Sequence, residues 1–273
     1  AIVKGSPIHE VLDNLDPTIK PSPGISYHFL SGSYEDDNPF NGIIASLDTK
    51  FKEGKWEFSV VSTKTSPQKV NQFVKDFEQR NKNKARIAWN GGYILNPELV
   101  GKLGIPESYI GSPLGLLISD GEILCPPLFN KPALLISENG SIEIQRVNAS
   151  KGITVSINGQ DYYADKNCYN IDEPVGELCY YDLMYDKGVI RSEGRIIVRL
   201  SGVQVKDIFR GGKNTEIIPV GMTLSFREDI FPNDLKIDDK VKICLHGFKE
   251  YRQGVEAGPL LLKNGKVSVD MEI

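Results

Sequence analysis

Asn90, Gly91, Gly92 and Tyr93 are the residues whose types and spacing best fit a binding site, within the stretch RIAWNGGYILNP. A pair of glycines indicates a backbone with φ > 0, a close approach of another group, or both. Consecutive N–H groups of such a pair can form a nest that holds a phosphate or a carboxylate. Asn90 can donate or accept a hydrogen bond there, and Tyr93 can stack on a sugar or a base. We therefore expect an anion-binding site; the alternative is a type I′ hairpin turn at Asn-Gly.

Glu256 is a second candidate, because it stands just before Gly258 and Pro259 in the stretch VEAGPLLL. Gly-Pro predicts a sharp entry into a buried strand, and the Glu256 carboxylate could face a cleft as a base or nucleophile. The alternative is a solvated loop residue. Since a site needs walls from more than one segment, we expect Asn90–Gly92 to line one pocket with Gly258 and Pro259.

The common catalytic and metal-binding patterns are absent from the sequence. The three histidines, His9, His28 and His246, are never four residues apart and belong to no Cys/His cluster. No zinc site can therefore be read from them. There is also no Walker loop, no GxGxxG and no GxSxG motif. We expect no cofactor, no dedicated metal site, and a function that does not depend on zinc.

The composition is that of a globular protein. Of the 273 residues, 25% are charged and 40% are hydrophobic, and the net charge is -4. This balance, with no basic stripe, gives no reason to bind a polyanion, so nucleic acid is not expected as a partner. No window approaches the ~18 consecutive apolar residues of a membrane span.

The four cysteines and the start of the chain leave alternatives open. The cysteines show no CxxC and no short metal-type spacing, so free buried thiols and disulfides both remain possible. They are Cys125, Cys168, Cys179 and Cys244. The chain begins with Ala1 and carries no signal peptide, which fits a processed secretory product or a cloned fragment. We expect a secreted, periplasmic or envelope protein.

A helix and a strand are predicted to position the glycine pair. Ser66 and Pro67 fit an N-cap and a first helical turn, and the apolar residues that follow are spaced i, i+3, i+4, i+7. These residues are Val70, Phe73, Val74 and Phe77. We expect this helix to pack on a sheet. Ile87–Trp89 would be the next strand and would place Asn90 at its carboxyl end, where ligand loops gather in α/β sheets.

About ten strands are expected in all, most of them joined in hairpins. Asp-Gly or Asn-Gly between apolar runs predicts hairpins in GLLISDGEIL, ALLISENGSIEIQRV and TVSINGQDYYA. Further strands are expected over 43–47 and 56–62, in RIIVRL, GMTLSF and KVKICLHG, and after Gly258 in GPLLLKNGKVSV. The predicted fold class is α+β, a single domain with mixed, hairpin-rich β-sheets and few helices.

The domain boundaries follow from the prolines. Residues 1–40 are rich in chain breakers, which predicts an N-terminal arm packed on the domain and not an independent module. Residues 41–273 then form the domain, because no linker or internal repeat divides them.

Three motifs in order, WNGGYI, SPLGLLISDGEI and EAGPLLLKNGK, resemble the phosphodiester glycosidase family. The resemblance runs from about Gly24 to the C-terminus and is strongest at the first and third motifs. It implies hydrolysis of a sugar joined through its anomeric carbon to a phosphodiester, as in removal of N-acetylglucosamine from a phosphorylated glycan. Bacterial members are linked to envelope or exopolysaccharide sugars.

The resemblance implies that Asn90, Gly91 and Gly92 line the site, with Tyr93 beside them and Gly258-Pro259 on the opposite wall. The expected partner is an anionic or phosphorylated carbohydrate. Phosphate is a good leaving group, so less help from a general acid is needed than for an ordinary glycoside.

The sequence departs from the family pattern in two ways. Ile94 replaces a common Phe, and the Arg-x-Ala-x-Gly and Asp-Gly-Gly-Gly-Ser motifs that usually follow do not occur before Ile273. Either a C-terminal piece is missing or this member binds without cleaving. Two classes therefore stay open, a phosphodiester glycosidase and a non-catalytic glycan-binding or envelope-associated domain. For the chain as given, we expect binding of an anionic sugar with poor hydrolysis, because the missing Arg and Asp would act in the transition state.

Overall fold

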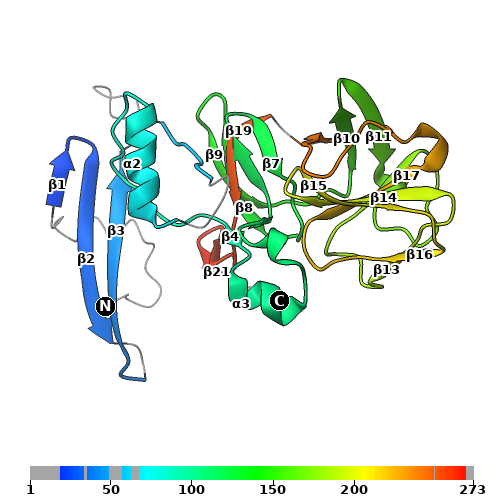
Figure 1. Cartoon of the computed structure of the whole chain (residues 1–273). Helices are drawn as coiled ribbons and strands as arrows, with labels where there is room; N and C mark the ends of the chain where they lie inside the picture. The colour runs from blue at the N-terminus through cyan, green and yellow to red at the C-terminus, as the bar shows by residue number, and fades with distance from the viewer. Residues whose placement is uncertain (1–18, 34–35, 49–56, 63–67, 249, 269–273) are drawn as a thin grey trace. The chain divides into compact units, whose positions relative to one another are not determined.

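The computed structural model describes residues 19–33, 36–48, 57–62, 68–248 and 250–268 (Figure 1). Of these residues, 43% lie in strands and 12% in helices, with two α-helices. Every ladder between described strands is antiparallel, and the sheets are small and numerous. The α+β prediction is therefore wrong, and the structure is mainly β. The reason is that the apolar runs alternate between tight turns, so neighbouring strands pair directly and leave no helical crossovers.

The chain divides into two compact units, residues 1–57 with 263–267 and residues 58–262 with 268–273. In the first unit, β1 (Ile19–Ser22), β2 (Ile25–Ser33) and β3 (Pro39–Leu47) form a three-stranded antiparallel sheet. The described part of the expected N-terminal arm is thus sheet, and the strand predicted over 43–47 lies inside β3. The division after residue 57 differs from the boundary after residue 40 that the prolines suggested.

A five-stranded sheet of the second unit carries the candidate residues. Its order is β7-β6-β19-β8-β9. The strands are β6 (Leu117–Ser119), β7 (Glu122–Cys125), β8 (Pro132–Ser137), β9 (Ile142–Arg146) and β19 (Tyr251–Glu256). Figure 1 shows β19, orange-red from late in the chain, among the green strands. The two hairpins of this sheet were predicted, and Asp120 (φ 52°) with Gly121 (φ 82°) forms the turn between β6 and β7. The central strand β19 was not predicted.

The other sheets of the second unit combine hairpins with pairs of strands that are distant in the sequence. A four-stranded sheet joins β12 (Leu178–Tyr181), β17 (Met222–Arg227), β14 (Arg195–Ser201) and β15 (Gln204–Arg210). A three-stranded sheet joins β11 (Gln160–Asp165), β10 (Gly152–Ile157) and β18 (Lys242–Leu245). Two-stranded sheets pair β4 (Tyr93–Ile94) with β5 (Pro113–Leu114) and β13 (Val189–Arg191) with β16 (Asn214–Glu216). The pair β20 (Leu262–Lys263) and β21 (Lys266–Val267) lies mostly in residues 263–267, which belong to the first unit.

The main hydrophobic core is shared by the three largest sheets of this unit. Leu135 from β8, Val155 from β10 and Leu224 from β17 belong to one cluster, and each is 0% exposed. Burial of such a side chain stabilises the fold by about 1.5–3 kcal/mol. The core therefore fixes β8, and β8 fixes its neighbour β19, which ends at Glu256.

Two helices are described, and only one of them was predicted. α2 (Val70–Arg80) carries the predicted apolar stripe, but none of its residues is buried. The expected cap at Ser66 and Pro67 lies outside the described residues. The second helix, α3 (Pro97–Leu103), has its first turn capped by Asn96, whose Oδ1 accepts from the N–H of Leu99 at 2.8 Å. Short 3₁₀ turns follow at η1 (Glu107–Tyr109), η2 (Lys166–Cys168) and η3 (Glu228–Ile230).

Two predicted strands are wrong, and a third region forms only short, exposed strands. Ile87–Trp89 and the described residues 57–62 belong to no ladder. Val60 is held by side chains: its N–H donates to Gln253 Oε1 at 2.9 Å, and Ser119 Oγ donates to its carbonyl at 2.9 Å. After Gly258 the chain forms the two-residue strands β20 and β21, and Leu262 is 50% exposed, so the buried strand expected there is absent.

Candidate functional site

The glycine pair approaches the end of β19 closely. Neither Gly91 nor Gly92 has a positive φ, so the type I′ turn and the αR–αL nest expected for this pair are both absent. A Cβ on Gly91 would lie 3.0 Å from Val255 Cγ2, and one on Gly92 would lie 3.2 Å from the carbonyl oxygen of Glu256. Glycine is needed here because any side chain would push the two segments apart.

Tyr93 links the first motif to the third. It begins β4, and its hydroxyl donates to the carbonyl oxygen of Gly258, 165 residues later, at 3.2 Å. The peptide bond between Gly258 and Pro259 is cis, and Pro259 is exposed. Asn90 is also exposed. The structure therefore brings Gly91, Gly92 and Tyr93 beside Glu256 and Gly258; no contact of Asn90 or Pro259 with the other motif is described.

Glu256 is the last residue of β19 and is only 2% exposed, so it is not a solvated loop residue. Its Oε2 accepts from the N–H of Leu116 at 2.7 Å, and its own N–H donates to the Leu116 carbonyl at 2.8 Å. Its Oε1 has no hydrogen-bond partner among the described residues. Gly115 (φ +107°) covers the carboxyl, since a Cβ there would lie 2.8 Å from Glu256 Cδ. One oxygen of this buried carboxyl group therefore makes no hydrogen bond to the described part of the protein.

The environment of Glu256 favours its protonated form. Burial raises the pKa of Glu256 to about 8, against smaller lowering effects of the Leu116 N–H and the Lys131 charge, while the charge of Asp182 raises it. At neutral pH the side chain is therefore largely a neutral acid. With Oε2 accepting from Leu116, the proton resides naturally on Oε1. This arrangement suits a proton donor and not the base or nucleophile considered from the sequence.

Lys131 supplies the positive charge near this acid. Its Nζ lies 4.7 Å from the ring centroid of Phe129 and 5.9 Å from that of Tyr93, within cation–π range. A Cβ on Gly258 would lie 3.7 Å from Lys131 Cδ, so the lysine stem passes beside the third motif. No ion pair of Lys131 is found in the described part of the chain. Lys131 could not be identified from the sequence, because its place depends on the unpredicted pairing of β19 with β8.

Cys125 is a buried thiol whose pKa is affected by the Glu256 carboxyl. Its thiol is fully buried, with Sγ 3.4 Å from the Pro126 carbonyl oxygen. Burial first, and then the charge of Glu256, raises the pKa of this thiol well above its ordinary range. Cys125 is therefore a buried, unreactive thiol.

His246, one of the three histidines, lies elsewhere in the fold. His246 Nε2 is 2.7 Å from Thr154 Oγ1, and a Cβ on Gly152 would lie 2.6 Å from His246 Nδ1, so this imidazole is packed within the three-stranded sheet. Over the described ranges, no three His, Cys, Asp or Glu residues form a group that could hold a metal ion. Within the same ranges, no helix is long and apolar enough to cross a membrane.

Two solved structures are similar to this chain in part. One is a "hypothetical protein" from Synechocystis, 16% identical, with a TM-score of 0.47 over 90% of this chain and 44% of that chain. The other is a "Putative exported protein" from Burkholderia pseudomallei K96243, 18% identical, with a TM-score of 0.27 over 64% of this chain and 42% of that chain. This chain therefore spans less than half the length of either. No family model and no curated protein matches the sequence.

Proposed function

We propose that this protein hydrolyses sugars that are joined through the anomeric carbon to a phosphodiester, with Glu256 as the proton donor. The observation that carries the proposal is the Glu256 carboxyl group. It is buried, its pKa is raised to about 8, and its Oε1 is unpartnered among the described residues. A buried polar atom without a partner costs about 1–3 kcal/mol, so its presence beside the conjunction of the sequence motifs calls for an explanation.

The surroundings suit an anionic sugar. The Lys131 ammonium can neutralise a phosphodiester, and the neutral Glu256 can donate to a phosphate oxygen without repelling it. Trp89 and Tyr93 are 57% and 55% exposed, and flat aromatic faces of this kind stack on sugar rings. The resemblance to phosphodiester glycosidases is the second support, because the motifs that carry it meet at this place.

The proposed reaction needs only one acid from the protein. It therefore departs from the poor hydrolysis expected from the two absent motifs, because Glu256 is proposed as the acid in their place. A water oxygen bonds to the anomeric carbon while the bond from that carbon to the phosphate oxygen breaks, and the leaving oxygen keeps the electron pair. Glu256 Oε1 gives its proton to the leaving phosphate, and the attacking water returns a proton to the carboxylate. Because phosphate departs readily, this single acid can suffice.

The test is release of free reducing sugar from a panel of hexose and N-acetylhexosamine 1-phosphodiesters. Glu256→Gln keeps the size of the side chain but removes the acid, and we expect turnover to fall by about 10²–10⁴-fold. Glu122→Gln is the matched control, since Glu122 is an exposed carboxylate on β7 of the same sheet. Loss of turnover in both variants, or in neither, contradicts the role given to Glu256.

A second candidate function is binding of the same sugar phosphate without cleavage. Asp182 is the carboxylate whose charge reaches Glu256, but it is 1% exposed and accepts hydrogen bonds from Tyr169, Asn170 and the N–H of Met184. It is therefore not free to serve as the second carboxylate of an ordinary glycosidase. Calorimetric binding of a sugar 1-phosphate without any turnover in the panel identifies this second function.

Location in the cell envelope or outside the cell is part of the proposal. It rests on the resemblance, whose bacterial members are linked to envelope and exopolysaccharide sugars. Cell fractionation with an antibody against the chain tests it, and recovery in the cytoplasmic fraction contradicts it.

A further inference from the structure

Cys168 and Cys179 are two free thiols held side by side. Both donate to one acceptor, the carbonyl oxygen of Val175, with Sγ···O distances of 3.5 Å for Cys168 and 2.9 Å for Cys179. Cys168 also packs on the small apolar cluster that contains Cys179. Because both thiols contact the same carbonyl oxygen, the two sulfur atoms lie close together.

The backbone brings the same two residues into register. Tyr169 and Tyr180 form a parallel β-bridge, and the N–H of Asn170 donates to the Tyr180 carbonyl at 3.0 Å. Cys168 and Cys179 each precede the bridged tyrosine by one residue, so they stand opposite each other. Paired strands lie ~4.8 Å apart, and disulfides span Cα distances of about 4.4–6.8 Å. A bond between these cysteines therefore needs little movement of the backbone.

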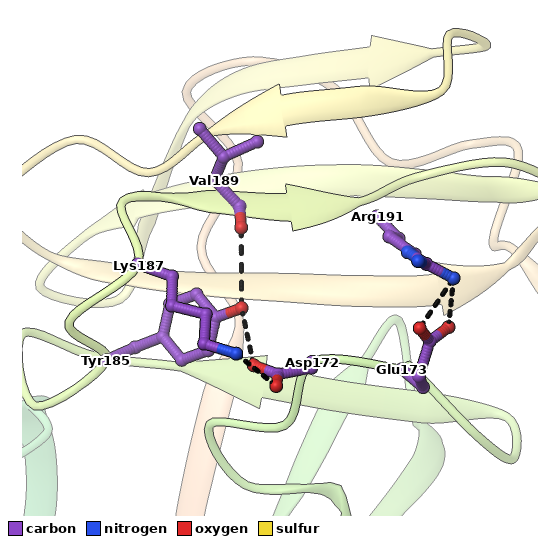
Figure 2. A network of polar contacts seen from close by, with 6 residues as sticks. All are labelled: Asp172, Glu173, Tyr185, Lys187, Val189 and Arg191. Carbon is purple, nitrogen blue, oxygen red and sulfur yellow. Dashed lines mark hydrogen bonds and ion pairs between the residues drawn. The ribbon is translucent and has the colours of Figure 1, made fainter.

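The segment between the cysteines contacts residues 185–191, as Figure 2 shows. Asp172 forms an ion pair with Lys187, and Glu173 binds the Arg191 guanidinium at 2.6 Å. The Tyr185 hydroxyl donates to Asp172 Oδ1 at 3.2 Å. These contacts fix the segment that joins the two cysteines. They therefore help to keep the two thiols close together before a bond forms.

We propose that Cys168 and Cys179 form an intramolecular disulfide when the protein meets an oxidising disulfide such as oxidised glutathione. Cys168 is half-buried and Cys179 is buried, so the oxidant reaches Cys168 first. The Cys168 thiolate attacks one sulfur of the oxidant, which releases one glutathione thiolate. Cys179 then loses its proton to solvent and attacks Cys168 Sγ, which releases the second glutathione. Two electrons pass to the oxidant and one S–S bond remains in the protein.

We expect the disulfide to stabilise the fold and to form slowly at neutral pH. Closing the loop between the cysteines restricts the unfolded chain and stabilises the fold. Burial, followed by the neighbouring Cys168 thiol, raises the pKa of Cys179 to about 12. The resolving step is therefore slow at neutral pH and faster at higher pH.

The experiment uses the full chain treated with oxidised glutathione or with a reductant, then alkylated and digested. Trypsin releases both cysteines in one peptide, residues 167–187. In the reduced sample this peptide carries two alkyl groups, and in the oxidised sample it carries none and is lighter by two hydrogen atoms than the unmodified dithiol peptide. Further cleavage after Glu177 leaves the two parts joined until a reductant is added. We expect the oxidised protein to show this link and a thermal midpoint higher by roughly 5 °C.

Variants separate this bond from other thiol chemistry. Cys168→Ser replaces the half-buried partner and is expected to abolish the shift of the midpoint on oxidation. Cys244→Ser removes the exposed thiol on β18 and is expected to leave the shift unchanged. The proposal is overturned if both Cys168 and Cys179 are alkylated after oxidation, if Cys168 retains glutathione, or if the link involves Cys244.

Discussion

Leu116 and Glu256 form a reciprocal pair, in which each backbone N–H donates to the other residue. The Leu116 N–H reaches Glu256 Oε2 at 2.7 Å, and the Glu256 N–H reaches the Leu116 carbonyl oxygen at 2.8 Å. The Leu116 N–H thus fixes Oε2 of the carboxyl group, while Oε1 has no partner among the described residues. The backbone of Leu116 therefore sets the orientation of the Glu256 carboxyl group.

The pH dependence of stability is the first prediction. The pKa of Glu256 is raised from 4.5 to about 8 in the folded protein, so the folded state binds more protons than the unfolded state between these values. The stability contributed by the protonated form is complete below the unfolded pKa and is lost as the pH rises through the folded pKa. We expect the loss to be on the order of 3 kcal/mol between about pH 5 and pH 8.

Glu256→Gln isolates this effect, because glutamine accepts from Leu116 and does not ionise. Urea unfolding of the wild type and this variant, at several pH values, gives the difference in unfolding free energy. The difference cancels other titrating groups, such as Asp182, whose pKa is also raised by burial. A difference that does not change with pH contradicts the raised pKa.

Gly115→Ala is the second prediction. A Cβ at Gly115 would lie 2.8 Å from Glu256 Cδ, while one at Gly121, also at positive φ, meets nothing within 4 Å. Both substitutions carry the cost of the left-handed backbone, ~1–2 kcal/mol. The extra overlap at Gly115 should add about 1–3 kcal/mol. Equal losses of unfolding free energy would show that Gly115 does not cover the carboxyl.

Gly92→Ala is the third prediction. Its Cβ would lie 3.2 Å from the Glu256 carbonyl oxygen, closer than nearly all such contacts, so the first motif must move away from β19. We expect turnover or sugar phosphate affinity to fall by about 10-fold or more. Gly101→Ala in α3 is the control, because a Cβ there meets nothing within 4 Å and alanine favours a helix. Unchanged binding by Gly92→Ala would mean that the glycine pair has no part in the site.

The local features of this fold follow from its sequence, and the long-range ones do not. Asp120-Gly121 and Asn158-Gly159 fix their hairpins within a few residues, so their turns are readable directly. The strand β19 has the sequence YRQGVE, and its charged and polar residues do not predict a central strand. Its burial depends on pairing with β8, more than one hundred residues earlier, and no local pattern reports such a pairing.

The candidate site shows the same limit. Gly91, Gly92 and Glu256 were selected from the sequence, but the reason given for the glycines was wrong in part. They permit a close approach to Val255 and have no positive φ. Lys131 was missed, because an isolated lysine before a proline carries no signal until β8 is placed beside β19. Helix α3 was also missed, although Asn96, Pro97 and Gly104 are the residues that begin and end such a helix.

Lys131→Met is the fourth prediction. Removal of the ammonium should weaken sugar phosphate binding by about 10–100-fold, the range for loss of a charge-assisted contact. The Lys131 charge also lowers the pKa of Glu256, so the variant should move that pKa upward. Lys242→Met on β18 is the control, since Lys242 is exposed in another sheet. Calorimetry measures the affinity, and an equal loss in the two variants would indicate a non-specific effect of charge.

The most direct test of the central claim is the pH profile of kcat/KM for a sugar 1-phosphodiester. If Glu256 is the proton donor, the rate depends on its protonated form and must decline as the pH rises through its pKa of about 8. We predict a plateau below that pH, a tenfold fall per pH unit above it, and a midpoint that moves upward in Lys131→Met. A rate that is flat or rises through this range, or no hydrolysis of any sugar phosphodiester, would contradict the assignment of Glu256 as the catalytic acid.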